Sequence, residues 1–163
     1  MAKAILICGK LCSGKTTYAK ELVRCRNAVL LSVDEITLLF GQHLGDKHNE
    51  VVDKTKRFLF KKAAELLFHG VSVVLDWGFW QSSERQEASA FFRDSGYEVE
   101  WHCVDADEQT LNSNLKKRNN TDNGNNEFYF IDHETAKYFW TLFEPPKRNE
   151  IDFWHHNDWI TAL

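Results

Sequence analysis

Short apolar runs alternate along this chain with longer segments of helical periodicity. Runs of strand length lie at 3–8, 28–32, 71–76 and 97–104, and their central residues are continuously apolar, as is typical of parallel strands buried on both faces. Between and after them, apolar spacing predicts helices at 15–25, 50–69, 83–95, 107–118 and 132–143, with a short helix at 35–40. We therefore expect an α/β fold of three layers, with helices on both faces of a parallel sheet of about five strands. The C-terminal tail is expected to pack back onto the sheet, with 159–163 as the candidate edge strand.

Polar residues and glycines mark the expected ends of several helices. Ser82 or Ser83 is placed to cap the helix at 83–95, and the stretch 105–108 resembles a capping box for the next helix. Gly70 and Gly96 stand where a helix end needs a left-handed residue. The run Asn-Asn-Thr-Asp-Asn-Gly-Asn-Asn at 119–126 is turn-forming and follows a basic cluster, so we expect a lid at about 116–131.

Length and composition are those of one globular domain over 1–163. The chain has 43% hydrophobic and 27% charged residues, and no apolar stretch approaches the roughly 20 residues that span a bilayer. The N-terminal apolar run is too short for a signal peptide, so a cytoplasmic location and no membrane partner are expected. The four cysteines contain no C-x-x-C pair and are read as reduced thiols rather than as zinc ligands.

The charge balance bears on the partners of the chain. A formal net charge of −4 gives no overall attraction for DNA or RNA. A local basic patch could still bind nucleic acid, and the single candidate is the cluster at 116–118. A small-molecule partner is favoured, and the oligomeric state is not indicated.

Directly after the first predicted strand stands a complete phosphate-binding loop. It comprises Gly9, Lys10, Leu11, Cys12, Ser13, Gly14, Lys15 and Thr16, followed by Thr17. Glycines let the backbone N–H groups of such a loop point inward at an anion, and the helix that follows adds the positive end of its dipole. The strand before the loop and the helix after it make a nucleotide site far more plausible than an ordinary glycine-rich turn.

Individual residues of this loop have expected roles toward ATP and Mg²⁺. Lys15 should reach the β- and γ-phosphates, Thr16 should ligate Mg²⁺, and Thr17 is placed to touch the α-phosphate. No Asn-Lys-x-Asp run is present to read guanine, which favours ATP. Cys12 is either a small filler or, beside Lys15, a thiol of lowered pKa.

Carboxylates follow two further strands, at Asp34 and Asp76. Ligands of open α/β sheets bind beyond the carboxyl ends of the strands, so both aspartates should face the γ-phosphate if their strands flank the first. Asp34 is the candidate base for an attacking hydroxyl, and Asp76 the candidate Mg²⁺ ligand, directly or through water. Which of the two dominates metal binding stays open. The alternative for each is a helix cap.

Phosphoryl transfer also needs cations around the developing charge. Arg118 and Arg85 are the candidates, and the alternative for each is a solvated helix charge. Aromatic residues beside Asp76, namely Trp77, Phe79 and Trp80, could stack on an acceptor. We expect two of those three to belong to the core.

Several motifs together resemble a known family. They are Gly-x-x-x-x-Gly-Lys-Thr-Thr at 9–17, Ser-Val-Asp-Glu at 32–35, Leu-Asp-Trp-Gly-Phe-Trp at 75–80 with Arg85, Arg-Asn at 118–119, and Phe-Glu-Pro-Pro at 143–146 with Glu150. The pattern resembles the small kinases often labelled AAA-family ATPases, which are similar to chloramphenicol phosphotransferase, zeta toxins and the polynucleotide kinase domain. The resemblance implies an adenylate-kinase-like sheet, Asp34 in the base position, Arg118 in the lid, and Arg85 facing substrate or phosphate.

The lid departs from the pattern of these kinases. They commonly carry a second lid arginine about one turn after the first, and here Asp122 and asparagines occupy that region. Lys116, Lys117 or Arg148 could replace it. Three functions therefore remain open: phosphotransfer from ATP to a small-molecule hydroxyl, 5′-hydroxyl phosphorylation of nucleic acid, and a regulatory ATP-binding module that hydrolyses ATP slowly.

Overall fold

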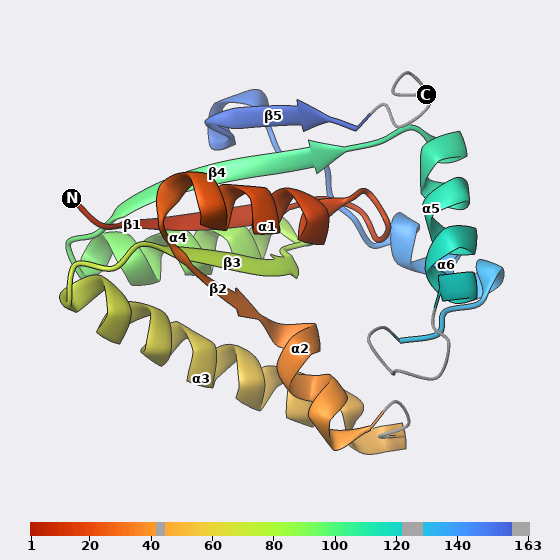
Figure 1. The fold of residues 1–163 in the computed structure, drawn as a ribbon, viewed down its shortest axis with the longest axis horizontal. Helices are drawn as coiled ribbons and strands as arrows, with labels where there is room; N and C mark the ends of the chain where they lie inside the picture. The colour runs from red at the N-terminus through yellow and green to blue at the C-terminus, as the bar shows by residue number, and fades with distance from the viewer. Residues whose placement is uncertain (42–44, 122–128, 158–163) are drawn as a thin grey trace.

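The computed structural model describes residues 1–41, 45–121 and 129–157, and its centre is a parallel sheet (Figure 1). The strands are β1 (Lys3–Cys8), β2 (Val29–Ser32), β3 (Val73–Gly78), β4 (Glu98–Asp105) and β5 (Phe153–His156), in the order β2-β3-β1-β4-β5. Every neighbouring pair is parallel. The carboxyl ends of all the strands therefore meet at one edge, as the alternating pattern predicts.

Helices cover both faces of this sheet. They are α1 (Lys15–Arg26), α2 (Val33–Thr37), α3 (His48–Phe68), α4 (Ser82–Asp94), α5 (Glu108–Thr121) and α6 (His133–Thr141). Alternate residues of β1 point to opposite faces: Leu6 packs in a cluster with residues of α3 and α4, and Ile7 packs in a second cluster with residues of α1. The three-layer α/β fold is thus confirmed.

The end signals of the helices agree with the structure in part. Gly70 and Gly96 have φ values of +78° and +81°, the left-handed conformation expected at these positions. The prediction that a serine caps α4 was wrong, because Gln81 is the capping residue and its backbone N–H donates to the Glu84 side chain, 3.3 Å away. A glutamate three residues after the cap can close this bond, so the helix begins at Ser82 without a serine cap.

The edge strand occupies a different part of the tail from the one expected. It is β5, whose residues run parallel to β4 with Phe153 opposite His102. The candidate strand 159–163 lies outside the described residues, as do residues 122–128 of the lid expected at 116–131. Among the described helices, none combines the length and the apolar composition needed to cross a bilayer.

Candidate functional site

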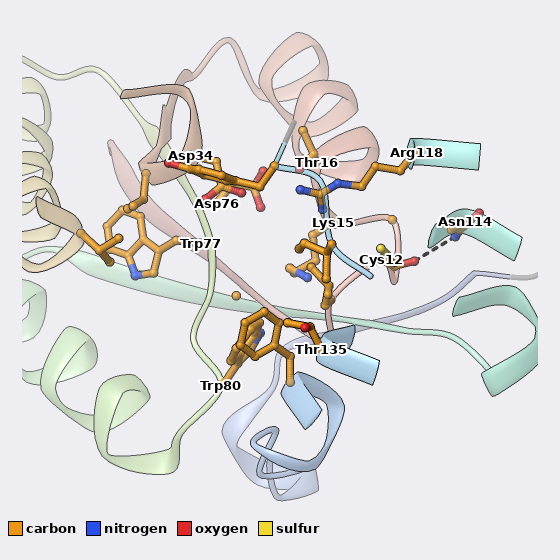
Figure 2. Close-up of a pocket in the computed structure, with 18 of the residues that line it drawn as sticks. Cys12, Lys15, Thr16, Asp34, Asp76, Trp77, Trp80, Asn114, Arg118 and Thr135 are labelled. Carbon is orange, nitrogen blue, oxygen red and sulfur yellow. Dashed lines mark hydrogen bonds between the residues drawn. The ribbon is translucent and has the colours of Figure 1, made fainter. Parts of the chain in front are cut away.

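A cavity of about 770 Å³ opens at the carboxyl edge of the sheet. The phosphate-binding loop, the start of α2, the end of β3, and parts of α3, α4, α5 and α6 form its walls (Figure 2). Its volume lies in the range of ligand pockets. This edge is where open parallel sheets bind their ligands.

The phosphate-binding loop contributes most of its members to the cavity wall. Residues 11, 12 and 14–17 line it, whereas Gly9, Lys10 and Ser13 do not. A Cβ atom on Gly9 would stand 2.3 Å from the carbonyl oxygen of Val104 in β4, so only glycine allows this approach. Gly14 begins α1 with a φ of +98°, which also favours glycine.

Three consecutive carbonyl groups of this loop, at residues 11–13, are held by side chains from distant parts of the chain. Trp140 Nε1 of α6 donates to the first, Asn114 Nδ2 of α5 to the second, and Asn157 Nδ2 after β5 to the third, each at 2.9 Å. In a trans peptide the next N–H points away from the carbonyl. These contacts therefore turn the N–H groups of residues 12–14 away from the side chains that hold the loop. None of these three residues is predictable from the sequence, since each lies more than 100 positions from its partner and no local motif marks it.

Lys15 lies half-buried under the loop. Its Nζ donates to the carbonyl of Lys10, within the same loop. Burial lowers the pKa of Lys15, and the nearby carboxylates of Asp76 and Asp34 oppose this shift. The ammonium group thus has carboxylates on one side and the loop on the other.

Asp76 ends the buried part of β3, with 5% of its surface exposed. Burial raises its pKa, while Lys15 and a hydrogen bond with Thr16 act in the opposite direction. Its Oδ2 has no hydrogen-bond partner among the described residues. Asp76 lies inside a strand and caps no helix, so its unsatisfied oxygen beside the Thr16 hydroxyl fits the oxygen ligands that Mg²⁺ prefers.

Asp34 lies in the first turn of α2, on the exposed side of the same cavity. The cap of this helix is Ser32, whose Oγ accepts from the N–H of Glu35, so Asp34 is not needed for capping. The expectation that both aspartate-bearing strands flank the first holds only for β3, because β2 lies one strand further out. Asp76 therefore stands next to the loop, and Asp34 further along the cavity.

Helix α5 brings Asn114, Lys117 and Arg118 to the cavity wall, beside the loop. In the view of Figure 2, Arg118 lies near Thr16 and across the cavity from Trp77. Cys12 faces this group. Burial raises the pKa of its thiol, although the positive charges of Arg118 and Lys15 oppose the shift. A lowered thiol pKa, one alternative from the sequence, is therefore wrong, and Cys12 is a small filler of the loop.

Arg85 lies elsewhere than expected. It is 3% exposed, does not line the main cavity, and its Nε is 3.2 Å from Glu150 Oε2. Its guanidinium also donates to the carbonyls of Phe79 and Trp80, and Glu144 N–H donates to the same Trp80 carbonyl. Arg85 and the Phe-Glu-Pro-Pro segment thus hold the turn between β3 and α4 together. The expectation of a phosphate-facing or acceptor-facing Arg85 is corrected accordingly, because its Nε donates to Glu150 and its Nη1 to two carbonyls of this turn.

Aromatic side chains line the cavity beyond the aspartates. Trp77 and Trp80 belong to the wall, while Phe79 is 1% exposed and packs in the core. One of the three residues is therefore in the core, not the two expected. Tyr129 and Phe139 add further aromatic surface, and Trp80 and Phe139 contact each other with ring centroids 5.5 Å apart.

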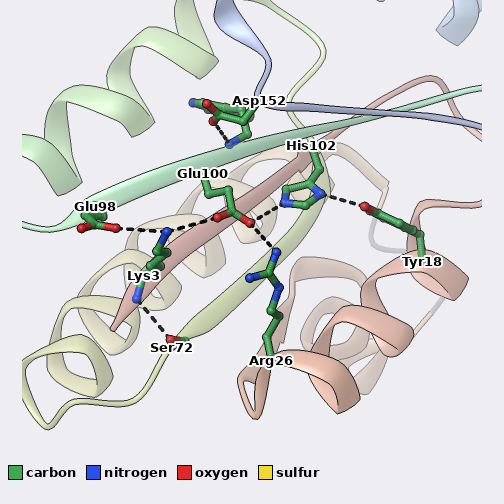
Figure 3. Close-up of polar contacts among 9 residues, drawn as sticks. Lys3, Tyr18, Arg26, Ser72, Glu98, Glu100, His102 and Asp152 are labelled. Atoms are coloured by element: carbon green, nitrogen blue, oxygen red, sulfur yellow. Dashed lines mark hydrogen bonds and ion pairs between the residues drawn. The ribbon is translucent and has the colours of Figure 1, made fainter. Parts of the chain in front are cut away.

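A polar network lies behind the site, between β4 and α1 (Figure 3). His102 Nδ1 is 2.8 Å from the Tyr18 hydroxyl, and its Nε2 is 2.9 Å from Glu100 Oε1. A carboxylate only accepts, so the ring proton is on Nε2 and the Tyr18 hydroxyl donates to Nδ1. Lys3 and Arg26 also contact the Glu100 carboxylate. The network fixes the start of α1, and hence the loop, against the sheet.

The cysteines and histidines form no second site in the described part of the chain. All four cysteines are free. Across residues 1–41, 45–121 and 129–157 no cluster of three or more histidine, cysteine or acidic side chains is arranged to hold a metal ion.

Comparisons with known proteins agree with this architecture. A family model described as AAA domain matches residues 5–145, while no curated protein matches the chain. Among solved structures, a candidate kinase from Chloroflexus aurantiacus has a TM-score of 0.76 at 16% identity, covering 99% of this chain and 91% of that chain. The APS kinase CysC from Mycobacterium tuberculosis, solved with AMPPNP and APS, has a TM-score of 0.67 at 18% identity, covering 96% of this chain and 89% of that chain.

A third neighbour comes from a nucleic-acid system. It is a chain of the Pnkp1/Rnl/Hen1 RNA repair complex, with a TM-score of 0.68 at 18% identity, and the match covers 86% of this chain and 43% of that chain. Identities this low show a shared fold. The fold of this chain is that of the P-loop kinases.

Proposed function

This chain belongs to the AAA domain family, and on that premise we propose that it is an ATP-dependent phosphotransferase that moves the γ-phosphate of ATP to a hydroxyl group of a small molecule. The observation that carries the proposal is the shared cavity of Lys15, Thr16, Asp76 and Asp34. A second substrate has room there, because the cavity continues past Asp34 to an aromatic end. A site for ATP alone has no need of that extension.

The phosphate-binding loop holds the donor. The Ser13 N–H donates to the Lys10 carbonyl within the loop, 3.2 Å away. The inward N–H groups of Cys12 and Gly14 and the N-terminus of α1 bind the phosphate oxygens. Lys15 exchanges its bond to the Lys10 carbonyl for bonds to the β- and γ-phosphates. The three side chains that hold the loop carbonyls keep this cradle in shape before ATP arrives.

Asp34 acts as the base. The acceptor hydroxyl gives its proton to the Asp34 carboxylate as its oxygen forms a bond to the γ-phosphorus. The bond from that phosphorus to the β,γ-bridging oxygen breaks in line, and ADP leaves with the electron pair. Asp34 is suited to this role because its carboxylate lines the cavity and caps no helix.

Thr16 and Asp76 are the residues that would hold Mg²⁺, which supplies positive charge to the β- and γ-phosphates when it is bound. Arg118 and Lys117 line the donor side of the cavity and add cationic groups around the transferred phosphate. Lys117 is our candidate for the role of the second lid arginine that this chain lacks. The lid itself remains a proposal, supported by Lys117 and Arg118 on α5 and by residues 129–131 at the cavity wall.

A transfer assay tests the proposal. The protein is incubated with γ-labelled ATP, Mg²⁺ and a library of metabolites and antibiotics, and the products are separated from ATP and inorganic phosphate. We expect label in at least one acceptor, at a rate above that of hydrolysis. Label found only in inorganic phosphate, across the whole library, would contradict the proposal and favour a regulatory ATPase.

The likeness to a chain of an RNA repair complex supports a second candidate, a 5′-hydroxyl kinase acting on nucleic-acid ends. The net charge of −4 argues against it. Binding of a short oligonucleotide measured over a range of salt concentrations decides the matter. This second function requires an affinity that falls steeply with ionic strength, and no binding at low salt would dismiss it.

A further inference from the structure

The acceptor end of the cavity carries information on what is phosphorylated, provided that the proposed phosphotransfer is right. This end lies beyond Asp34, where the first turns of α3, the end of β3 and the start of α4 meet. His48, Lys56, Trp77 and Glu84 are among the residues that line it. Their charges and shapes define the chemistry that can bind there.

An ion pair stands in this wall. Lys56 Nζ of α3 is 2.7 Å from Glu84 Oε1 of α4, and the two side chains are 26% and 31% exposed. The other carboxylate oxygen of Glu84 accepts from the N–H of Gln81, which fixes its orientation. The pair thus offers a donor and an acceptor side by side, with no net charge.

The remaining charges disfavour an anionic acceptor, and the one other basic side chain lining this end of the described cavity is the weak base His48. The other lysine and arginine side chains that line the described cavity, Lys15, Lys117 and Arg118, belong to its phosphate-binding side. At the acceptor end, a carboxylate, sulfate or phosphate would meet the negative charges of Asp34 and Asp76, and would have to break the Lys56–Glu84 pair to gain a cation. Breaking this half-buried pair would cost both side chains a charge-assisted hydrogen bond.

Flat aromatic surface accompanies the ion pair. Trp77 packs edge-on against Phe60, with ring centroids 5.3 Å apart, and lies tilted against Phe79, with centroids 4.9 Å apart. It still borders the cavity. Trp80 lies on another side of the same space, held by Phe139. Indole faces fit the C–H surface of a saturated ring, while a neighbouring donor and acceptor fit two adjacent hydroxyl groups, each of which can donate and accept.

We propose that the acceptor is a neutral polyhydroxylated ring compound, a sugar or cyclitol or a molecule that carries one. One hydroxyl of the ring meets Asp34 and receives the phosphate. A pair of adjacent hydroxyls meets Lys56 and Glu84, one accepting from Nζ and the other donating to the carboxylate. The ring rests on Trp77.

The experiment compares three groups of acceptors with γ-labelled ATP: neutral monosaccharides, cyclitols and nucleosides; sugar acids and sulfated or phosphorylated sugars; and a 5′-hydroxyl oligonucleotide. We expect turnover in the first group alone. With the best neutral acceptor, Lys56→Met and Glu84→Gln should raise the acceptor KM by about 10-fold or more, because each removes a charge-assisted hydrogen bond. The KM for ATP should change by less than about 3-fold, which a general loss of structure would not produce.

Lys62→Met is the matched control, since Lys62 lies on the same helix in an exposed pair with Glu65, outside the cavity. It should leave both KM values unchanged. Deoxy analogues of the best acceptor add a second readout. Loss of a hydroxyl that contacts the pair should weaken binding to the wild type, but should have little further effect in Lys56→Met or Glu84→Gln.

The possible results distinguish a wrong acceptor class from a wrong function. Preferred transfer to an anionic sugar or an oligonucleotide would overturn the inference and leave the phosphotransfer function standing. An unchanged acceptor KM in both Lys56→Met and Glu84→Gln would also overturn it. ATP binding without transfer to any of the three groups would contradict the proposed function, and the inference with it.

Discussion

The side-chain amide of Asn157 donates to the carbonyl oxygen of Ser13 across 2.9 Å, joining the segment after the edge strand β5 to the phosphate-binding loop. Both residues are buried, at 8% and 0% exposure. A buried carbonyl without a partner is costly, so this contact stabilises the loop conformation. The C-terminal part of the chain therefore contributes to the nucleotide site from behind.

Replacement of Asn157 by alanine should weaken both the fold and the site. The lost hydrogen bond leaves the Ser13 carbonyl unsatisfied, and we expect the free energy of unfolding to fall by about 1–3 kcal/mol. ATP affinity should fall as well, because the loop is less well held. Urea unfolding and ATP titration measure the two effects. Asn149→Ala, an exposed asparagine, should stay within about 0.5 kcal/mol of the wild type, and an equal loss in both variants would contradict the role of Asn157.

The Tyr18–His102–Glu100 network should make stability depend on pH. Burial lowers the pKa of His102 below its ordinary value of 6.5, so the unfolded chain binds a proton more readily. The stabilising contribution is complete above pH 6.5 and is lost as the pH falls below that value. Denaturant unfolding between pH 8 and pH 5 should show this decrease.

His102→Gln is the matching variant for this pH effect. The substitution should lower the free energy of unfolding by about 1 kcal/mol at pH 8, because glutamine forms poorer hydrogen bonds with Tyr18 and Glu100. Its stability should change less between pH 8 and pH 5 than that of the wild type.

Glu100 adds a second decrease of stability, at more acidic pH. Although burial acts to raise its pKa, hydrogen bonds and charges from His102, Arg26 and Lys3 lower it below 4.5. Parallel pH profiles of the wild type and of His102→Gln would contradict the assignment of the pH effect to His102.

Asp76→Asn should separate stability from activity. Burial raises the pKa of Asp76 above its ordinary value of 3.8. The free energy of unfolding is therefore higher when Asp76 is protonated, and it falls as the pH rises from 3.8 through the folded pKa. At pH 7 the variant should therefore unfold at a higher temperature than the wild type in the absence of nucleotide. Phosphotransfer with Mg²⁺ should fall by about 100-fold or more, because the variant lacks the proposed metal ligand. A lower Tm for the variant would contradict the assignment of burial as the dominant cause.

Much of the fold could be predicted from the sequence because the strands are buried on both faces. The run at 3–8 is apolar at every position after Lys3, and β1 has the same bounds. The edge strand was harder to predict. Strand β5 has the sequence Phe-Trp-His-His, and it is a strand because its backbone pairs with β4 and its Phe153 ring stacks on His102 at 4.8 Å. Neither contact is visible in a local pattern.

For the candidate site, local motifs predicted several residues that line the cavity, whereas no local motif marks the residues that hold the loop in place. The loop at 9–17 follows its strand in sequence, so its place was predictable. Arg85 was misjudged because its partner Glu150 lies 65 positions away, and a sequence motif does not say whether an arginine faces a ligand or its own fold. Asn114, Trp140 and Asn157 were missed for the same reason.

The central claim is that Asp34 takes the proton of an acceptor hydroxyl at the site where Lys15 holds the donor phosphate. The most direct test is the turnover of Asp34→Asn with an accepted hydroxyl compound, measured together with its ATP affinity. We predict that phosphotransfer falls by about 100-fold or more while ATP affinity changes by less than about 3-fold. Lys15→Ala should impair both. Unchanged turnover in Asp34→Asn would contradict the claim.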